Sequence, residues 1–447
     1  MRKQIFSILF FSIFFYSISI FISSSISFAA TEFVSSIMQS GGDYNTLSSW
    51  EAAINTDLTV SSTKVYSASS TTGTVSDAAT VTGSVSTTTK AKVLHNATSS
   101  SRVLVENLRK VITGTSTFST SSNIVTGAGT LYTTELANND YIWLESSQTW
   151  QQVLSIQSST QLTLTATSTI AGAGQSSVRG KSNFQSGEQL QVNGSNYIVI
   201  SNTGDSAIAT AKIDGAWTSA DTTAVTIDGW TTTSTNYIKI YTTTAARHNG
   251  KWDDTKYRLG VNDSQDGIFI QELYVKIFGL QIYDIGYSGR SSIKWEFYSD
   301  NWVEVGYNLI KKQTLSNFRA GIQALYANML AYNNIIYIDA GAGTYSYGIV
   351  IYANNAAQIS KLYNNTIVGA SQTGSVGIEN DRGDIYAKNN LIYNSTAATF
   401  GLTGSANVDY NATDLSSLGY TAQANDRVSQ TFTFVSTSTN DFHLAFN

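Results

Sequence analysis

The sequence Tyr332-Asn333-Asn334-Ile335-Ile336-Tyr337 carries a short phrase, an asparagine followed two residues later by an isoleucine, that recurs between Tyr274 and Asn411. Its copies are Asn308-Leu309-Ile310, Asn334-Ile335-Ile336, Asn365-Thr366-Ile367 and Asn390-Leu391-Ile392, and an earlier variant is Gly279-Leu280-Gln281-Ile282. Successive isoleucines of these five units are 28, 26, 31 and 25 residues apart. A repeat of this length is typical of solenoids, in which each unit stacks on the next.

Apolar and polar residues alternate around each isoleucine, as in a β-strand, and polar turn residues fill the rest of each unit. We therefore predict an all-β fold, a parallel β-helix whose coils stack about 4.8 Å apart, because a single coil cannot bury its inward side chains. We expect the asparagines to lie where each strand turns, to tolerate left-handed backbone angles there, and to hydrogen-bond along the stack. The alternative is an antiparallel sandwich with asparagine-rich hairpins.

Three segments resemble rungs of right-handed parallel β-helix repeat proteins of the pectin-lyase-like superfamily, and they are Tyr332–Tyr337, Leu362–Val368 and Ala387–Tyr393. Val408-Asp409-Tyr410-Asn411 resembles the last rung of such proteins, and Asn440–Leu444 resembles the segment that follows it. Relatives continue from there into a small terminal cap, so the resemblance implies a truncated C-terminus. It covers about half of the chain. It implies a fold rather than an activity, because lyases, hydrolases, adhesins and inert scaffolds share this fold.

The composition excludes some classes of partner. Charged residues make up 13% of the 447 residues, and the formal net charge is −5. A nucleic-acid-binding protein needs a basic face, so nucleic acid is not expected as a partner. The chain also has no basic stripe for an anionic lipid surface. It contains no cysteine, so packing rather than disulfide bonds must stabilise it.

The first 29 residues have the pattern of a secretory signal peptide. Arg2 and Lys3 supply the positive start, an apolar run follows from Ile5 to Ile22, and Ser27-Phe28-Ala29 supplies small residues at the cleavage positions. We predict cleavage after Ala29 and a secreted or cell-surface protein whose mature chain has no membrane span. The alternative is an uncleaved membrane anchor, because the apolar run is about long enough to cross a bilayer.

Residues 30–111 are expected to hold an N-terminal cap helix and the first coils. Thr46 can cap a short helix with Ser49 at its third position, and Leu47, Trp50 and Ile54 share one face of that helix. The helix resembles the one that seals the first coil of β-helix proteins, and a surface helix packed on a sheet is the alternative. From residue 61 to residue 90, 17 residues are serine or threonine, which predicts narrow first rungs or a flexible stalk.

Residues 112–180 break the coil pattern and are typical of a compact meander of short strands. Strands are expected at Asn123–Val125, Tyr141–Leu144, Gln152–Ile156 and Gln161–Leu164. The segment resembles a small β-barrel module of phage-tail and bacterial surface proteins, inserted between early coils, and such modules bind or space. The β-helix is expected over residues 181–447, with early strands at Leu190–Val192 and Tyr197–Ile200 and its main rungs over residues 274–411.

Thr242–Leu259 is the chemically most varied stretch and is expected to form a long loop between two strands. Its substrate-binding candidates are Arg247, His248, Lys251, Trp252 and Arg258. The cationic side chains suit a carboxylated or sulfated sugar, Trp252 suits the face of a sugar ring, and Asp253 with Asp254 suit calcium. The alternative is a loop tied to the flank of the solenoid by its own ion pairs.

A second acidic group, Glu379-Asn380-Asp381-Arg382-Gly383-Asp384, lies in a turn between two rungs. The resemblance to calcium-dependent β-helix lyases implies Ca²⁺ at Asp381 and Asp384 and a base at Arg382 or Lys388. The metal would neutralise the charge that develops when a proton leaves beside a uronate carboxylate. A solvated, glycine-containing turn is the alternative. Glycosidases of this fold carry Asp-Asp on a rung strand and Gly-His-Gly, and neither is found here, so hydrolysis is the weaker enzymatic hypothesis.

Two functions remain open. The first is a non-catalytic scaffold that binds polysaccharide or another surface along a sheet face, where tyrosines that recur every coil form a sugar-binding strip. The second is a Ca²⁺-dependent polyuronate lyase of the pectate-lyase type. The tyrosines concerned are Tyr326, Tyr332, Tyr337, Tyr345, Tyr347, Tyr352, Tyr363, Tyr386 and Tyr393. The pattern alone does not divide those that pack in the core from those that face a polymer.

Overall fold

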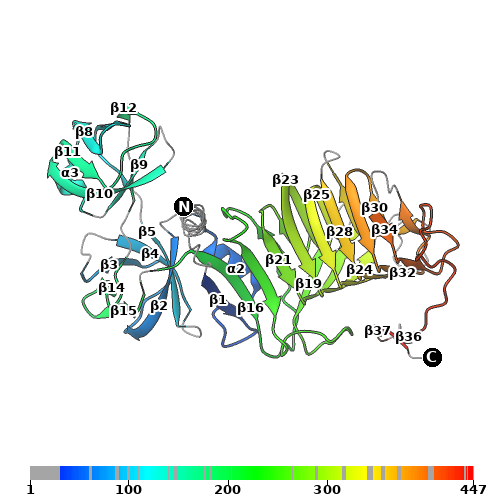
Figure 1. The fold of residues 1–447 in the computed structure, drawn as a ribbon. Helices are drawn as coiled ribbons and strands as arrows, with labels where there is room; N and C mark the ends of the chain where they lie inside the picture. Colours follow the sequence, from blue (N-terminus) through cyan, green and yellow to red (C-terminus); the bar gives the residue numbers. More distant parts are fainter. Residues whose placement is uncertain are drawn as a thin grey trace, which may run out of the picture. The chain divides into compact units, whose positions relative to one another are not determined.

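The computed structural model describes residues 31–447, apart from residues 60–62, 86–89, 98–100, 108–109, 139, 145–148, 176–177, 181–183, 203, 264, 287–289, 315–318, 340–345, 354–357, 370–373, 401–406, 437–438, 440 and 446–447. The segment predicted to be a signal peptide lies outside these residues. No helix in the described part of the chain is long and apolar enough to cross a membrane. The fold of the described residues is all-β, with long parallel sheets, two larger antiparallel units and a short antiparallel hairpin (Figure 1).

Parallel strands stack in three columns, and each coil passes from the first column to the third and then to the second. The first column consists of β1 (Thr31–Ile37), β16 (Ala207–Ile213), β18 (Ile238–Thr242), β21 (Val275–Phe278), the second halves of β23 (Ile293–Gly306) and β25 (Arg319–Tyr332), β28 (Ile359–Tyr363), β31 (Asp384–Lys388) and β34 (Asn407–Asp409). This arrangement is that of a parallel β-helix, as the repeat spacing predicts.

The other two columns complete each coil. The second consists of β17 (Val225–Ile227), β20 (Ile268–Ile270), the first halves of β23 and β25, β27 (Ser346–Tyr352), β30 (Ser375–Asn380) and β33 (Ala397–Phe400). The third consists of β19 (Arg258–Asp263), β22 (Gln281–Gly286), β24 (Leu309–Thr314), β26 (Ile335–Asp339), β29 (Thr366–Val368), β32 (Leu391–Tyr393) and β35 (Ala412–Thr413).

The predicted column of isoleucines is confirmed. The five residues are paired in register along the third column, and each is at most 1% exposed; they are Ile282, Ile310, Ile336, Ile367 and Ile392. Glycines on the second column leave the space that these isoleucines fill. A Cβ atom at Gly348 would lie 2.5 Å from Cγ2 of Ile367, so a side chain there would displace the core.

Buried asparagines form a hydrogen-bonded ladder at the corner between the first and third columns. Oδ1 of Asn365 accepts from the backbone N–H of Asn334 at 3.1 Å and from its Nδ2 at 3.0 Å. Nδ2 of Asn365 donates to the Ala331 carbonyl and to Oδ1 of Asn390, both at 3.0 Å. The ladder begins at the N–H of Leu280, and its rungs are Asn308, Asn334, Asn365, Asn390 and Asn411. The predicted hydrogen bonding along the stack is therefore confirmed.

The left-handed backbone angle belongs to the residue before each ladder asparagine. The φ angle is 54° at Asn333 and 55° at Asn364, whereas the ladder residues that follow them have no positive φ. The expectation of left-handed angles at the repeated asparagine itself is therefore wrong. The preceding, more exposed residue adopts the left-handed backbone angle that the turn requires. The ladder side chain can therefore point inward.

Residues 63–107 and 189–200 form a closed antiparallel barrel rather than coils of the β-helix. Its strands are β2 (Thr63–Thr72), β3 (Thr80–Gly83), β4 (Lys90–Ala97), β5 (Arg102–Asn107), β14 (Gln189–Asn193) and β15 (Asn196–Ile200). The expected first rungs or stalk over residues 61–90, and the expected rung strands at Leu190–Val192 and Tyr197–Ile200, are therefore wrong. Apolar and polar residues alternate alike in a rung strand and in a barrel strand, so the pattern did not separate them.

Residues 110–180 form an eight-stranded antiparallel sheet with an apolar core of its own, which includes Phe118, Tyr132 and Ile142. The strands expected at Tyr141–Leu144 and Gln161–Leu164 are confirmed as β9 and β11, and β8 and β10 overlap the other two. The elements are β6 (Lys110–Val111), β7 (Thr115–Phe118), β8 (Ile124–Ala128), α3 (Tyr132–Glu135), β9 (Tyr141–Leu144), β10 (Thr149–Ser158), β11 (Gln161–Leu164), β12 (Gly172–Gln175) and β13 (Val178–Gly180).

The expected helix is confirmed as α2 (Leu47–Ile54). Oγ1 of Thr46 accepts from the backbone N–H of Ser49 at 3.0 Å, and the Thr46 N–H donates to Oγ of Ser49 at 3.3 Å. Leu47, Trp50 and Ile54 are fully buried, and they belong to the same apolar core as the coils. The capping box and the apolar face thus place this helix against the first coils.

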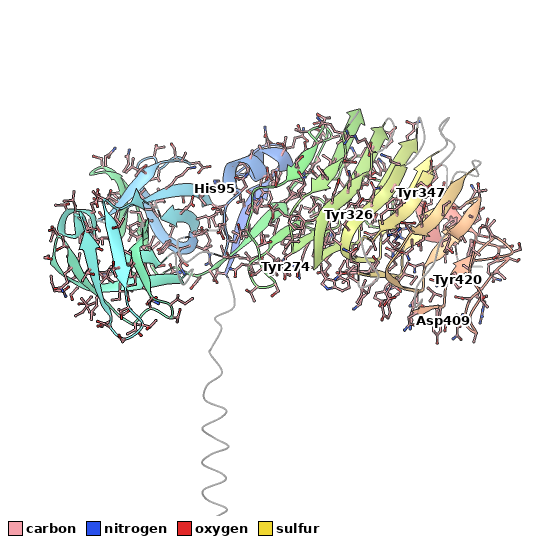
Figure 2. The ribbon with its side chains drawn as sticks, turned by 90° about the horizontal axis from the view of Figure 1, so that it is seen from above. His95, Tyr274, Tyr326, Tyr347, Asp409 and Tyr420 are labelled. Atoms are coloured by element: carbon pink, nitrogen blue, oxygen red, sulfur yellow. The ribbon has the colours of Figure 1, made fainter. Side chains whose placement is uncertain are left out.

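The barrel shares that apolar core, through Val65, Leu94 and Leu104. Nearby, His95 on β4 is 5% exposed and has Nδ1 2.9 Å from Oδ2 of Asp77 and Nε2 3.7 Å from Oδ1 of Asp43 (Figure 2). Burial alone would lower the pKa of His95, but the two carboxylates overcome this and raise it to about 9. The imidazolium therefore links the barrel to the segment that follows β1.

This link makes stability depend on pH in a defined direction. Because the pKa of His95 is raised, its contribution is complete below its unfolded-state pKa of about 6.5 and is lost as the pH rises through about 9. His95→Gln should lower the free energy of unfolding by about 3 kcal/mol near pH 6, with the deficit vanishing near pH 10. Urea unfolding of both proteins across this range measures the difference.

His443→Gln is the matched control, because the exposed ring of His443 contacts Asp441 at the surface, where an ion pair contributes about 0–1 kcal/mol. A deficit for His95→Gln that stays constant with pH would contradict the charged link.

Candidate functional site

A long loop occupies one corner at which later coils make a two-residue turn. β18 ends at Thr242 and β19 begins at Arg258, so residues 243–257 connect the first column to the third. In the next coil the same connection is only Gly279-Leu280, and after that Tyr307-Asn308. We call residues 243–257 the corner loop. Its position between two sheet faces lets its side chains reach either face.

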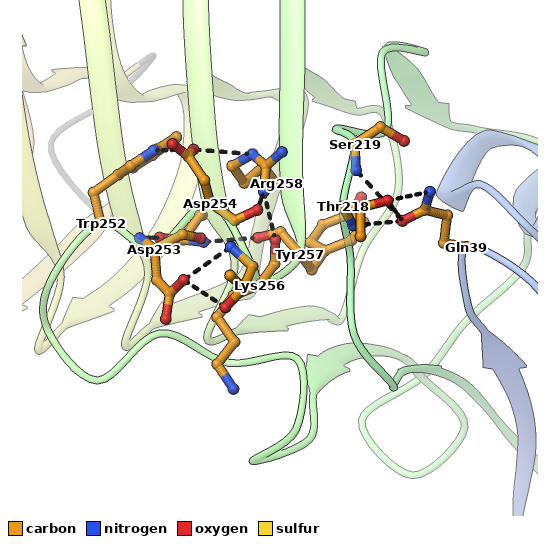
Figure 3. A network of polar contacts seen from close by, with 11 residues as sticks. Gln39, Thr218, Ser219, Trp252, Asp253, Asp254, Lys256, Tyr257 and Arg258 are labelled. Atoms are coloured by element: carbon orange, nitrogen blue, oxygen red, sulfur yellow. Dashed lines mark hydrogen bonds and ion pairs between the residues drawn. The ribbon is translucent and has the colours of Figure 1, made fainter.

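Gln281, which is fully buried, holds the corner loop in place (Figure 3 shows the loop). Its Oε1 accepts from the N–H of Asp253 at 2.7 Å, and its Nε2 donates to the carbonyls of Asp253 at 2.9 Å and Tyr257 at 3.1 Å. The Asp253 carboxylate accepts from the N–H of Thr255 at 2.8 Å and from its hydroxyl at 2.6 Å, and these bonds lower the pKa of Asp253. Asp253 is thus committed to the turn of the loop.

His248 and Lys251 contact neighbouring segments of the chain. The Gly250 N–H donates to Nδ1 of His248 at 3.0 Å, so Nε2 carries the proton and donates to the Tyr307 carbonyl at 2.9 Å. Burial lowers the pKa of His248 to about 4, so the ring is neutral at neutral pH and brings no charge to an acidic sugar. Lys251 pairs through its backbone with Asp441.

That partner lies in a C-terminal hairpin, β36 (Phe434–Ser436) and β37 (Asp441–Leu444), which covers part of the outward side of the third column. The ring of Phe442 lies 5.0 Å from that of Tyr337, and the ring of Phe434 lies 5.3 Å from that of Tyr393. These two tyrosines of the predicted strip are therefore packed against the hairpin rather than open to a polymer.

The outward side of the first column carries aromatic residues in register. Tyr241, Phe278, Gly306, Tyr332 and Tyr363 are successive partners along the stack. A Cβ at Gly306 would lie 2.9 Å from the Tyr332 ring. Because glycine leaves this space open, Tyr332 leans across it toward Phe278, with ring centroids 6.4 Å apart.

Four rings line a cavity of about 270 Å³ on this row, which we call the aromatic cavity. Its lining residues are Tyr241, Phe278, Tyr307, Tyr332, Lys239 and Arg247. The Tyr307 ring meets the Tyr332 ring edge-on at 5.4 Å. Tyr307 occupies the left-handed corner position, with a φ of 58°, and its side chain is 47% exposed.

The polar groups around the aromatic cavity are paired within the protein. Lys239 Nζ lies 2.8 Å from Glu32 Oε1, and the Tyr332 hydroxyl donates to Glu304 Oε1 at 2.8 Å. Arg247 donates to the hydroxyl of Thr242 at 3.1 Å and to its carbonyl at 2.8 Å. Burial raises the pKa of Tyr332, so its hydroxyl stays protonated. Aromatic rings flanked by polar groups that are already hydrogen-bonded suit the apolar face of a sugar.

A second cavity of about 300 Å³ lies on the outward side of the third column, and we call it the tryptophan cavity. Its lining residues are Ala220, Trp252, Asp254, Arg258, Gly260, Tyr283 and Lys311. Trp252 Nε1 donates to Asp254 Oδ1 at 3.0 Å, and Arg258 Nε lies 3.4 Å from the same oxygen (Figure 3). The five loop candidates therefore do not form one site: Arg247 lines the aromatic cavity, and Trp252 and Arg258 line this one.

The candidates of the acidic turn are spread along a strand. Asp381 and Arg382 are exposed before β31, with Arg382 Nε 3.8 Å from Asp381 Oδ2. Asp384 begins β31 and Lys388 ends it, so about 13 Å of strand separates their backbones. Lys388 is paired in register with Asp409. Among the described residues, no three His, Cys, Asp or Glu side chains are grouped so as to hold a metal ion.

The tyrosines of the predicted strip fall on different faces. Tyr332, Tyr363 and Tyr386 lie on the outward side of the first column, Tyr347 is buried in a small apolar cluster with Tyr352 at its edge, and Tyr326 has a left-handed φ of 65°. Tyr345 lies outside the described residues. Sequence reasoning missed Tyr241, Phe278, Tyr283, Tyr307 and Lys311, because only the register between coils shows that they line cavities.

Comparisons with known proteins add little. No protein-family profile and no curated protein matches the chain. Among solved structures, it is similar to the tailspike gp61 of Pseudomonas phage phi297, with 9% sequence identity and a TM-score of 0.20. The match covers 70% of this chain and 64% of the tailspike chain. Likeness at this level carries no argument about function.

The role of Gln281 predicts how the corner loop responds to mutation. Gln281→Leu removes three buried hydrogen bonds to the loop, each of which contributes about 1 kcal/mol. Limited trypsin digestion after Lys251, Lys256 or Arg258 should therefore become at least about tenfold faster than in the unmodified protein. Mass spectrometry of the fragments locates the cut.

Gln191→Leu on the barrel strand β14 is the matched control, because among the described contacts the side chain of Gln191 hydrogen-bonds only to that of Gln189. Equal rates of cleavage in the corner loop for Gln281→Leu and Gln191→Leu would contradict the conclusion that the hydrogen bonds of Gln281 hold the loop in place.

Proposed function

We propose that the chain is an exported β-helix scaffold of the pectin-lyase-like type that binds polysaccharide along the outward side of its first column. The aromatic cavity carries this proposal, because four rings from successive coils and from one corner converge there. Coils of a β-helix stack about 4.8 Å apart, so a polymer that lies along the stack meets rings from more than one coil. Stacking on rings gives affinity, and the paired polar groups at the rim orient the sugar hydroxyls.

The proposal assigns structural roles to the neighbouring units. α2 and the barrel seal the first coil, and the shared apolar core that contains Trp50, Leu94 and Leu104 supports this role. A seal is needed because an open coil end exposes apolar core and unpaired strand edges. The eight-stranded sheet of residues 110–180 acts as a spacer or a binding module in its own right, supported by its separate apolar core.

Export rests on the sequence of residues 1–29, whose basic start, apolar run and small residues before Ala30 form the pattern of a signal peptide. The proposal therefore places the protein in the secreted fraction or at the cell surface, where polysaccharides are the abundant extended polymers.

No comparable support exists for the lyase hypothesis. Of its two proposed bases, Lys388 ends β31, whereas the proposed Ca²⁺ ligands Asp381 and Asp384 lie at the start of that strand. The other, Arg382, lies beside them, but its guanidinium is already paired with Asp381, with Nε 3.8 Å from Oδ2. Proton abstraction next to a uronate carboxylate needs the base and the metal at a single sugar unit.

Tyr307→Asn tests the proposal without disturbing the turn. Other corners of the stack carry asparagine at this left-handed position, as at Asn333 and Asn364, so the backbone keeps its conformation. The substitution removes one ring of the aromatic cavity and should weaken retention by polysaccharides about tenfold. Affinity electrophoresis in gels that contain pectin, alginate, xylan or dextran measures retention.

Tyr410→Asn is the matched control, because Tyr410 is also an exposed corner residue with a φ of 62° but lies at another coil. Retention that is unchanged by Tyr307→Asn, or lost equally with Tyr410→Asn, would contradict the proposal. Chelator-sensitive formation of unsaturated uronate products in the same samples would show a lyase instead.

A further inference from the structure

We infer that the tryptophan cavity is a second, separate binding site, which takes a single sugar ring bearing a carboxylate, such as a uronate residue. The inference goes beyond the proposed function, because this cavity lies on the third column and shares no lining residue with the aromatic cavity. Its volume of about 300 Å³ lies at the lower end of the range for small-molecule sites and is large enough for one sugar ring.

The charge of the cavity indicates the class of ligand. Asp254 compensates Arg258, whose Nε lies 3.4 Å from its carboxylate. Lys311 also lines the cavity, and no carboxylate within ion-pair distance of its Nζ is found in the described part of the chain. One cation is thus left over at the wall of a cavity, which favours an anionic ligand.

Other outward lysines show that this arrangement is not general. Four of them lie 2.7–3.3 Å from a carboxylate oxygen, and these are Lys212, Lys239, Lys276 and Lys294. Lys361 is an exception, because its ammonium lies over the Trp302 ring at 4.9 Å with no carboxylate within ion-pair distance among the described residues, but it lines neither cavity. Lys294 is one parallel to Lys311, since each ammonium lies over an aromatic ring, that of Phe269 at 4.9 Å and that of Tyr283 at 5.5 Å. Only Lys294 of this pair has a carboxylate beside it, that of Glu296 at 2.7 Å.

The walls of the cavity suit a sugar ring. The rings of Trp252 and Tyr283 have centroids 6.2 Å apart and planes at 71°, so they present two differently oriented aromatic surfaces. Gly260 lies beside Tyr283 in register and has no side chain to fill the space. Trp252 is held by its bond to Asp254, which in turn contacts Arg258, so the aromatic wall is positioned before a ligand arrives.

The test uses D-glucuronate as the probe, with D-glucose and acetate as controls, in saturation-transfer NMR titrations of the whole protein. Glucuronate should bind with a dissociation constant on the order of 1 mM, the value expected for one ring of ordinary ligand efficiency. Glucose should bind at least about tenfold more weakly, because it lacks the carboxylate that pairs with Lys311.

Lys311→Met should weaken glucuronate binding about tenfold or more and leave the weak binding of glucose unchanged, since it removes the charge and keeps the length of the side chain. Lys294→Met should leave glucuronate binding as in the unmodified protein. Equal binding of glucuronate and glucose, or no effect of Lys311→Met, would overturn the inference. Glucuronate binding that is lost in Tyr307→Asn but kept in Lys311→Met would place the ligand in the aromatic cavity and overturn it as well. These readouts are separate from polysaccharide retention, so the two proposals can fail independently.

Discussion

The asparagine ladder fixes the angle between two faces of the stack, and the arrangement of both cavities follows from it. Each ladder side chain donates to a backbone carbonyl of the preceding coil, and each except that of Asn411 also bonds the asparagine of the next coil, as Asn365 does with Ala331 and Asn390. These groups are buried, so each lost bond would leave polar atoms without water. The turn is therefore kept to two residues, and outward side chains of successive coils stay in register.

The chemically most varied side chains lie where a longer connection replaces the two-residue turn. Between β18 and β19 the corner loop replaces the two-residue turn, and Gln281 in the following coil supplies the hydrogen bonds that hold it. The interior of a β-helix is packed with apolar side chains, so a binding site has to be built on its outward faces or loops. The corner loop contributes Arg247 to one face and Trp252 to the other.

Local repeats were enough to predict the isoleucine column and the ladder, because each unit repeats the same phrase at the same corner. The barrel was missed because Leu190-Gln191-Val192 alternates as a rung strand does, and its antiparallel partner β3 lies far away in the sequence. Arg247, Trp252 and Arg258 of the corner loop were expected in one site. The loop runs from one face of the stack to the other between Arg247 and Trp252, so these residues line different cavities. The contact of Tyr332 with Phe278 across Gly306 depends on the register of three coils whose connections differ in length.

The free energy of unfolding of Asn365→Ala tests the central role of the ladder most directly. The control is Asn364→Gly, a substitution of the residue that precedes Asn365. Asn364 is exposed and has a φ of 55°, which glycine adopts freely, so that substitution should change the stability by no more than about 0.5 kcal/mol. Asn365→Ala leaves several buried groups without partners and should lower it by about 3 kcal/mol or more. Equal stabilities of the two variants would contradict the account.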